Sequence, residues 1–482
     1  MVYSKLGIFI FRRDMRLDDN LGLLELEKYV DYIFPIFILD ENQILLNNKN
    51  KNYFSNNAVQ FICESLIDLN HQLNNYNSRL RLFFGNPIDI IEELIKYFNN
   101  KYQIIIGFNK DFSSYAELRD NNINNICKTY DVHIIIYEND YILTPYILNK
   151  NNTAYKHYSA YYKNALKHKI NEPIKNNFKK YIKSNLKIKT KNNFSEFNIK
   201  NLYKFYKENI NLAQHGGRKI AINKLKHIDT FKDYNILRDR LDYDTTNLSA
   251  YLNLGCISIR EAYYHIKNNL GINNILLKQL YWRDFFLTAY IFLENAKKYN
   301  YMDERYIDIK WKNDINDWKL LFKGTGFLLI DAAIQELLIS GFIHNRARLL
   351  LGTFWTKYLL IDTFHKKYGS QVGFSKYLVD AIGPSQNKMN HHWITEFDYA
   401  GKRYAPKNIP IAGRYMDISN KMIKKYDPEC IYIKKWLPHL LNIPNKELIN
   451  WNEDIAKKYN YIHPSPLFDH KLKYNEWINA CK

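Results

Sequence analysis

The sequence predicts an α/β domain with a doubly wound parallel sheet, followed by a large all-helical domain. Short apolar and β-branched runs alternate with helical patterns through the first 140 residues, which is typical of βαβ units. From residue 201 onward helical periodicity dominates, with breaks at Gly and Pro. We therefore expect the α/β domain over residues 1–140, a connector over 141–200 and the helical domain over 201–482.

The expected strands are short apolar runs, as buried parallel strands would be. The first covers residues 7–11, Gly-Ile-Phe-Ile-Phe, and a helical pattern covers Ala58 to Leu73. The other strand-like runs lie at residues 32–39, 80–84, 103–107 and 132–137. No GxGxxG motif opens the first helix, so the sequence does not support a plain dinucleotide-binding fold.

The chain is strongly basic, with a formal net charge of +20 and a pI near 9.3. This imbalance indicates nucleic acid as the leading class of partner. A/T-rich codon usage, which favours Lys, Asn, Ile and Tyr, would produce the same imbalance without selection for binding. Between Lys163 and Lys191 there are ten Lys against one acidic residue, Glu172, and we interpret these charges as a solvated face of the connector.

Several classes of protein are disfavoured. No stretch is long and apolar enough to span a bilayer, and Met1 to Phe11 lacks the features of a signal peptide, so we expect a soluble, intracellular monomer without a membrane partner. The five scattered cysteines form no CxxC pair, which argues against zinc, an iron–sulfur cluster and a disulfide framework. We assign no metal to the neighbouring His391 and His392.

Polar segments within the helical half carry the candidate chemistry. Asp244 to Ser249 precedes an apolar run and offers hydroxyl, amide and backbone donors to a phosphate, although an ordinary helix cap also explains it. Gln279 to Asp284 joins a stacking tryptophan to an arginine, which suits an extruded base; the alternative is a buried tryptophan beside an Arg–Asp pair. Gly341 to Leu349 holds a histidine, an amide and two arginines, which indicates anionic ligands.

Arg348 and Asp380 would form an ion pair at the centre of the helical domain. Such a pair either satisfies the polar edges of a cofactor or serves the fold alone.

These segments, read in order, resemble the cryptochrome/photolyase family along nearly the whole chain. The N-terminal matches are Phe11 to Asn20, Val59 to Phe61 and Leu80 to Pro87. The helical half adds Thr245 to Ser249, Trp282 to Phe285, Thr325 to Phe327, Ile330 to Ala333 and His344 to Arg348. The C-terminal matches are Tyr426 to Pro428, Trp436 to Pro438 and His463 to His470. One such motif would be weak evidence, but the ordered set is specific.

The resemblance implies a non-covalent, U-shaped FAD and repair of UV-damaged DNA, in which light-excited reduced flavin gives an electron to a pyrimidine dimer. It implies an Arg348–Asp380 pair against the flavin and Gln279 beside the cofactor. The phosphate contacts that it implies are Tyr234, Thr245, Thr246, Asn247, Leu248 and Ser249. A second antenna chromophore of the folate or deazaflavin type is also implied, and neither type has an unmistakable signature.

The lesion assignment depends on two helices. Asn345 and Leu349 stand where (6-4) photolyases carry two histidines, and an asparagine is similar to cyclobutane-dimer enzymes. Trp282 matches their lesion-stacking tryptophan, whereas Gln279 replaces their usual glutamate and is more like (6-4) enzymes and animal cryptochromes. We predict cyclobutane dimers as the substrate. The expected DNA contacts are Trp282, Arg283, Asn345, Arg346, Leu349 and Arg403, with Lys402, Arg414 and Lys421 as further candidates.

The segment from Asp380 to Trp393 departs most from the family pattern. Ile382 stands where family members carry a second Asp. A one-residue insertion would place Asn387 near flavin N5, Trp393 at a second lesion-contacting position and His391 at the inner tryptophan of the electron-transfer chain. Without the insertion, Gln386 and His392 take two of these roles.

The tryptophan chain that normally carries electrons to the flavin is therefore expected to be interrupted. The middle position is Thr363, and the outer one is preserved as Trp311, the expected exit residue. We hypothesise a weakened or rerouted photoreduction. Aromatic residues that offer another route are Trp355, Tyr358, Tyr399 and Tyr404.

Four functions are compatible with these sequence features. A light-driven repair enzyme for cyclobutane dimers is favoured by Trp282 and Asn345, and by a chain that stops twelve residues after His470, whereas cryptochromes often add a long tail. The alternatives within the family are a (6-4) photolyase and a blue-light photoreceptor without repair activity. A basic nucleic-acid-binding protein without flavin would leave the phosphate-binding segment unexplained.

Overall fold

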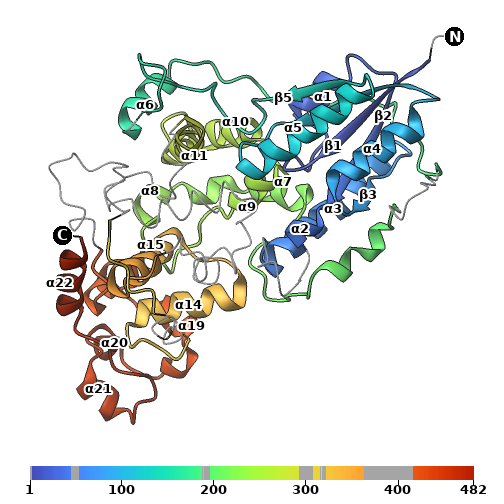
Figure 1. Ribbon diagram of the computed structural model, residues 1–482. Helices are drawn as coiled ribbons and strands as arrows, with labels where there is room; N and C mark the ends of the chain where they lie inside the picture. The colour runs from blue at the N-terminus through green and yellow to red at the C-terminus, as the bar shows by residue number, and fades with distance from the viewer. Residues whose placement is uncertain are drawn as a thin grey trace.

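The sheet of the N-terminal half is parallel throughout, with the strand order β3-β2-β1-β4-β5 (Figure 1). The computed structural model describes residues 3–44, 54–155, 157–186, 188, 196–292, 308–314, 316, 322–362 and 416–481. The strands are β1 (Lys5–Phe11), β2 (Tyr32–Leu39), β3 (Arg81–Phe84), β4 (Gln103–Asn109) and β5 (His133–Tyr137). Each coincides with an expected apolar run to within two residues.

Helices cover both faces of this sheet, because alternate residues of each strand point to opposite sides. Leu6, Ile8 and Ile10 of β1 pack with α4 (Pro87–Phe98) and α5 (Ser114–Thr129). Phe9 and Phe11 pack on the other side, with α1 (Leu21–Leu26) and α3 (Asn56–Asn74). A short α2 (Glu41–Ile44) follows β2. This arrangement confirms the predicted doubly wound α/β class.

The part of the chain expected to be a connector contains one helix, α6 (Tyr158–Ala165), and extended segments that follow the edge of the sheet. Tyr181 bridges to Ile33 of β2, and Phe197 bridges to Leu82 of β3. The described lysines of this part are exposed, as the solvated-face interpretation expects. The proposed domain boundaries at residues 140 and 200 stay predictions.

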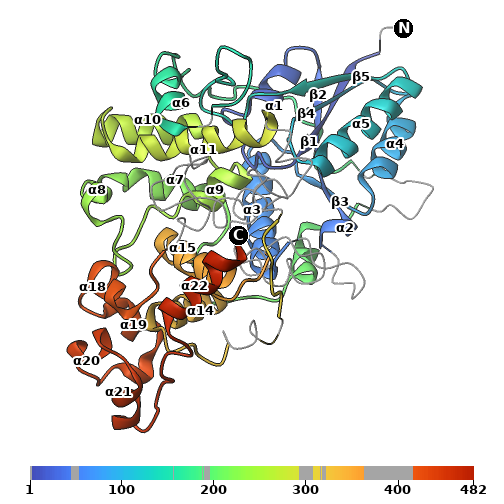
Figure 2. The same ribbon diagram turned by 60° about the vertical axis from the view of Figure 1, so that its left-hand side comes forward.

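The rest of the described chain is helical, and no strand follows β5 within the described ranges. Its elements are η1 (Ile199–Phe205), α7 (Arg218–Lys226), η2 (Ile228–Phe231), α8 (Tyr234–Leu237), α9 (Ser249–Leu254), α10 (Ile259–Leu270), α11 (Ile275–Phe292), α14 (Leu328–Ser340), α15 (Asn345–Thr353), the π-helical η4 (Phe354–Tyr358), η7 (Asn420–Met422), α18 (Ile423–Tyr426), α19 (Ile431–Trp436), η8 (Pro438–Leu440), α20 (Asn445–Ile449), α21 (Glu453–Lys458) and α22 (His470–Ala480). Figure 2 shows α14, α15 and the later helices as a lobe set apart from the sheet.

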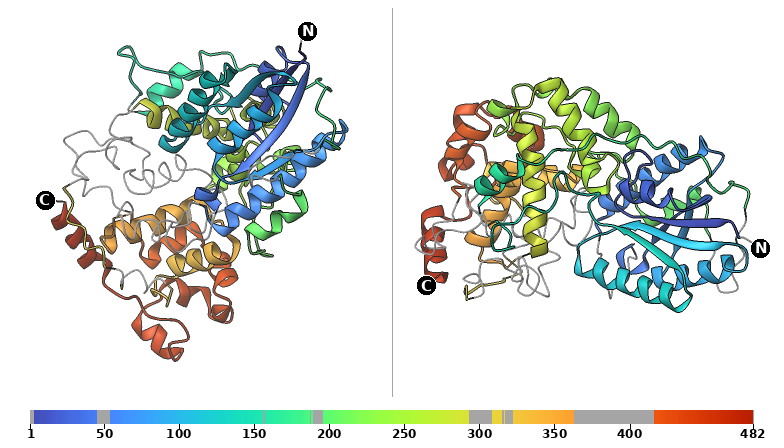
Figure 3. Two further views of the ribbon diagram at one scale, coloured as in Figure 1. Left: turned by 45° about the vertical axis from the view of Figure 1, so that its right-hand side comes forward. Right: turned by 90° about the horizontal axis from the view of Figure 1, so that it is seen from above.

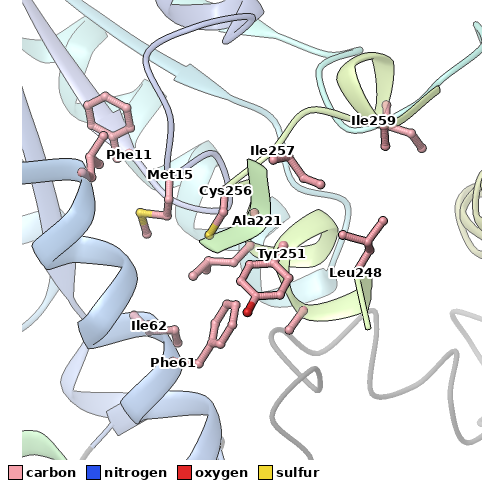
Figure 4. Close-up of a cluster of buried hydrophobic side chains, with 14 of the residues drawn as sticks. Phe11, Met15, Phe61, Ile62, Ala221, Leu248, Tyr251, Cys256, Ile257 and Ile259 are labelled. Atoms are coloured by element: carbon pink, nitrogen blue, oxygen red, sulfur yellow. The ribbon is translucent and has the colours of Figure 1, made fainter. Parts of the chain in front are cut away.

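One hydrophobic core joins the sheet to the first helices of the helical half. In Figure 4, Phe61 of α3 faces Tyr251 of α9, and their rings meet edge to face at 5.1 Å. Met15, from the loop after β1, lies in the same cluster as Cys256. A second core holds α14, α15 and α18 to α21 together. The helices that carry the candidate site therefore pack into these cores, α9 and α11 into the first and α15 into the second.

Buried charges strengthen the junction between the two halves. Asp140 accepts two hydrogen bonds from Arg16, at 2.7 and 2.8 Å, and one from Arg260 of α10 at 3.2 Å. Arg260 also donates to Asp19 at 2.9 Å. The loop after β1 passes so close to Gly255 that a Cβ there would lie 2.1 Å from the Arg13 carbonyl oxygen. The Phe11 to Asn20 motif thus fixes the first half against the second.

Candidate functional site

Helix α15 carries four of the predicted site residues, and its first turn sets their directions. The Nδ1 atom of His344 accepts from the backbone N–H of Arg346 at 3.0 Å and caps the helix. Burial, reinforced by the Arg346 charge, lowers the pKa of His344 to about 4, so the ring is neutral near pH 7. Asn345 is exposed, whereas Arg348 and Leu349 are buried. One turn of helix therefore points an amide outward and a guanidinium inward.

The two arginines of this helix have different surroundings. The guanidinium of Arg346 makes two hydrogen bonds to the Oδ1 atom of Asp239, at 2.9 and 2.6 Å. The Nε atom of Arg348 donates to the Ile343 carbonyl at 3.1 Å, and its guanidinium lies 5.0 Å from the centre of the Phe342 ring. Arg348 is thus held rigidly inside the helical lobe, while Arg346 lies at its border.

The predicted phosphate-binding segment leads into α9. Thr245, Thr246 and Asn247 are partly exposed, and Asn247 adopts a left-handed φ of +50°. The Thr245 hydroxyl lies 3.4 Å from the Asn247 side-chain oxygen. Ser249 is the first residue of α9, so the backbone N–H groups of its first turn face the same end of the helix. This set of donors suits an anion.

Tyr234 opens α8 and lies within electrostatic range of Arg238, Arg346 and Asp239. Burial raises the pKa of its hydroxyl, so Tyr234 stays neutral and can donate a hydrogen bond. The structure thus brings Tyr234 near the start of α15, although the two are more than a hundred residues apart in the sequence. The phosphate contact of Tyr234 stays a prediction.

Helix α11 presents Gln279 and Trp282 one turn apart, both partly exposed. The indole of Trp282 is stacked face to face on the ring of Tyr158 from α6, with centroids 3.6 Å apart and an interplanar angle of 6°. Figure 3 shows α6 lying beside α11. The connector helix is therefore in direct contact with a predicted lesion-binding residue.

Arg283 and Asp284 do not cap Trp282 as a pair. The Arg283 guanidinium donates to the carbonyl oxygens of Tyr141 and Leu252, and the Asp284 carboxylate accepts from the backbone N–H groups of Leu143 and Thr144, each at 2.8 Å. Burial, partly opposed by these N–H groups, raises the pKa of Asp284 to about 6. Arg283 and Asp284 thus bind the backbone of the segment that follows β5. A DNA contact of Arg283 stays a prediction.

Two family motifs have a structural role that the contacts make plain. The carboxylate of Asp331 accepts from the backbone N–H groups of Thr325 and Gly326, at 2.8 and 2.9 Å. The same carboxylate lies 2.8 Å from the Nε2 atom of His463. These bonds hold the C-terminal motif against the turn before α14.

Trp311 is partly exposed and packs against Trp477 of α22, with ring centroids 6.2 Å apart. Trp355 and Tyr358, two of the alternative relay residues, are buried in η4, against which α22 packs. Lys421 is exposed at η7. The role of Trp311 as an exit residue stays a prediction.

Some predicted residues lie outside the described residues. They are Thr363, Asp380, Ile382, Gln386, Asn387, His391, His392, Trp393, Tyr399, Lys402, Arg403, Tyr404 and Arg414.

Sequence reasoning missed three residues that belong to this region. Tyr158 carried no signal, because it lies in a polar connector. Asp239 stands between two arginines in the sequence, which was a usable hint of an ion pair. Glu336 of α14 accepts from the Tyr432 hydroxyl at 2.6 Å, and burial raises the pKa of this carboxyl to about 7, although Lys435 and Arg348 oppose the shift.

A pocket opens at the carboxyl ends of β1, β2 and β4, where doubly wound sheets bind ligands. Apolar residues such as Phe37 and Ile44 line it together with Arg12 and Arg119. Asp120 binds both arginines, at 2.9 Å each. The Nη2 atoms of both arginines are buried without a hydrogen-bond partner among the described residues. Guanidinium nitrogens that still lack an acceptor suit a ligand with anionic or carbonyl oxygens.

Two kinds of feature are absent from the described residues. No helix among them is long and apolar enough to cross a membrane. They also contain no group of three side chains suited to hold a metal ion.

Comparison with known proteins places the chain. The model of the family described as DNA photolyase matches residues 8–178, and that of the FAD binding domain of DNA photolyase matches residues 276–482. The chain belongs to the cryptochrome/photolyase family. Its C-terminal half is accordingly an FAD-binding domain of the photolyase type.

Relatives within the family carry both kinds of name. A deoxyribodipyrimidine photo-lyase of Alkalihalophilus pseudofirmus is 26% identical over 98% of this chain and 97% of its own length. Cryptochrome-2 of Gallus gallus is 27% identical over 95% of this chain and 80% of its own length.

Solved structures agree with the fold. An archaeal photolyase from Sulfolobus tokodaii, solved with two FAD molecules, has a TM-score of 0.79, with 29% identity over 98% of this chain and 99% of that one. A class III photolyase from Agrobacterium tumefaciens has a TM-score of 0.81 at 20% identity over 100% and 98% of the two chains, which shows the fold alone.

The residues present fit FAD. A diphosphate needs several donors close together, and Thr245 to Ser249 with the start of α9 supply hydroxyl, amide and backbone groups. Arg348 adds a planar, permanently charged fork inside the lobe.

Proposed function

We propose that the protein repairs cyclobutane pyrimidine dimers in UV-damaged DNA by a light-driven reaction. The observation that carries this proposal is the geometry of α15, on which Asn345 is exposed while Arg348, three residues later, is buried. One helix can thus contact the lesion side and the flavin side of the site. The absence of a histidine at positions 345 and 349 favours cyclobutane dimers over (6-4) products.

FAD, when bound and reduced, supplies the electron that splits the dimer. The protein side chains bind, orient and exclude water. Tyr234 and the segment Thr245 to Ser249 would hold the phosphates, and Arg348, with Asp380, would lie against the flavin. Leu349 would exclude water beside the lesion. Asn387 and Ile382 would complete the cofactor site. Trp282 would stack on the flipped lesion, and Trp393 would make a second contact to it.

Gln279 favours a different substrate. Its amide can hydrogen-bond a thymine edge but cannot share a proton as a carboxyl can. A glutamine at this position resembles the pattern of (6-4) enzymes and cryptochromes. A (6-4) photolyase is therefore the second candidate. Arg346 and Arg403 would contact phosphates in either case.

A repair assay under blue light distinguishes these functions. Reduced, purified protein is incubated with oligonucleotides that contain either a cyclobutane dimer or a (6-4) product, and the repaired strands are quantified. We expect repair of the cyclobutane dimer alone, with no conversion in the dark. Repair of the (6-4) product alone would reverse the lesion assignment. Repair of neither by protein that holds FAD would identify a photoreceptor.

We also propose that the pocket beside β1, β2 and β4 holds a second chromophore with an anionic or carbonyl-bearing group. Folate, deazaflavin and flavin all have such groups, and the Sulfolobus tokodaii photolyase was solved with two FAD molecules. The unsatisfied Nη2 atoms of Arg12 and Arg119 support this proposal.

Loss of one charge-assisted hydrogen bond should reduce binding about tenfold. We therefore expect Arg119→Gln to lower the second-chromophore content about tenfold, while the FAD content is unchanged. Absorption spectroscopy and mass spectrometry of the released chromophores measure both. A second chromophore retained equally in the variant would place it elsewhere.

A further inference from the structure

Tyr158 and Trp282 form a close aromatic stack in the candidate site. Their planes differ by 6° and their centroids are 3.6 Å apart, which is full face-to-face contact. On the helix surface the next turn brings Phe286 to Trp282, at 5.5 Å and 26°. Trp282 thus contacts two nearly parallel aromatic rings and is partly exposed.

Tyr158 itself is firmly held. Its hydroxyl donates to the Lys278 carbonyl at 2.8 Å, which ties α6 to α11 across 120 residues of sequence. Its ring stacks on Tyr162 at 5.5 Å and 16°, and meets Phe285 edge to face at 5.7 Å. A side chain with these contacts does not leave easily, because each one restricts its rotation.

We propose that Tyr158 is a positioning residue that fixes the ring plane of Trp282 for lesion binding. This inference rests on the proposed function, in which Trp282 contacts the flipped dimer. Trp282 is otherwise able to rotate about two side-chain bonds, and ordering it at the moment of binding costs affinity. The stack with Tyr158 orders the indole before the lesion arrives.

The surroundings of this stack fit a nucleic-acid surface. Lys278 is exposed and its ammonium group lies 5.7 Å from the Tyr162 ring. Lys163 of α6 is also exposed. Phosphates beside a lesion would find positive charge next to the ordered indole.

Variants at Tyr158 distinguish two effects of its side chain, the orientation of the Trp282 ring and simple apolar packing. Tyr158→Phe keeps the flat ring and removes only the bond to Lys278. Tyr158→Leu and Tyr158→Met keep apolar volume and remove the flat face. We expect about fivefold weaker binding of dimer-containing oligonucleotide for Leu and Met, within twofold of wild type for Phe, and unchanged binding of undamaged DNA. The KM for repair should rise with the Kd while kcat stays within twofold.

Controls distinguish this inference from the proposed function. Tyr264→Leu removes a partly exposed ring of α10 that meets Tyr263 edge to face at 5.3 Å and has no assigned role in the stack, so its dimer affinity should stay within twofold. In Trp282→Leu protein, adding Tyr158→Leu should cause no further loss. Thermal melts of each variant report folding, and the ratio of dimer to undamaged binding is compared among folded proteins.

Three outcomes would overturn a claim. If Trp282→Leu leaves dimer discrimination intact, the assignment of Trp282 in the proposed site fails. If Trp282→Leu impairs discrimination and both Tyr158→Leu and Tyr158→Met do not, the positioning role of Tyr158 fails. Equal loss for Tyr158→Phe, Leu and Met would show that the hydroxyl bond, and not the stack, is what matters.

Discussion

Replacing Asp140 by Ala is expected to lower the free energy of unfolding by about 3–5 kcal/mol, the usual cost of removing one partner from a buried ionic cluster. The side chains of Arg16, Arg260 and Asp140 are at most 5% exposed. Without the carboxylate, Arg16 would lose the ion pair that it makes at 2.7 Å, and Arg260 would keep only its pair with Asp19. Urea unfolding of the purified protein measures the change.

The pH dependence gives this prediction a second test. Burial alone would raise the pKa of Asp140, but the charges of Arg16 and Arg260 hold it below its ordinary value. A carboxyl with a lowered pKa contributes stability above its unfolded pKa and loses it as the pH falls. The difference in unfolding free energy between wild type and Asp140→Ala should therefore become smaller below about pH 4.

A matched control comes from a surface pair of the same half. Glu25 binds Lys28 at 2.6 Å, but the lysine side chain is 63% exposed. Glu25→Gln should change stability by less than about 0.5 kcal/mol. If Asp140→Ala unfolds at the same urea concentration as Glu25→Gln, the junction does not depend on its buried charges.

The second large effect concerns flavin retention. Arg348→Met should weaken FAD binding about 10- to 100-fold, because a hydrogen bond to a charged group contributes roughly 1.5–3 kcal/mol. Methionine keeps much of the apolar stem but has no fork to pair with a cofactor edge. The FAD-to-protein ratio after gel filtration, and fluorescence titration of the apoprotein, measure the loss.

The control is another arginine of the same half. Arg240 binds Asp242 at 2.6 Å, is partly exposed and has no assigned role at the cofactor. Arg240→Met should keep its FAD within twofold of wild type. Equal loss in both variants would mean that charge in general, and not the fork of Arg348, retains the flavin.

The local elements of this protein could be predicted from the sequence alone. The apolar runs of β1 to β4 are largely buried on both faces, so their composition carries the signal without a partner, whereas β5 is partly exposed. The donor residues before α9 and the polar turn of α15 were found for the same reason, since capping and helical spacing act over a few residues. Their order along the chain then indicated the family.

The partners of these side chains could not be predicted in the same way. Trp282 was expected to present a flat face, and the structure stacks Tyr158 on one face of the indole, from a connector interpreted as a solvated surface. Arg346 was assigned to DNA, and its guanidinium binds Asp239. The neighbours of these residues in the sequence do not identify their partners, because 107 residues separate Arg346 from Asp239 and 124 separate Trp282 from Tyr158.

The sequence by itself determined the α/β and helical halves, the candidate residues on α11 and α15, and the family. The tertiary structure decided how these residues are held: Asp140 between two arginines, His344 neutral at the start of α15, and Trp282 stacked on Tyr158. The physical reason is the separation along the chain over which each interaction acts. Periodicity, capping and turn preferences act between near neighbours, whereas burial, ion pairing and ring stacking depend on which distant segments the folded core brings into contact.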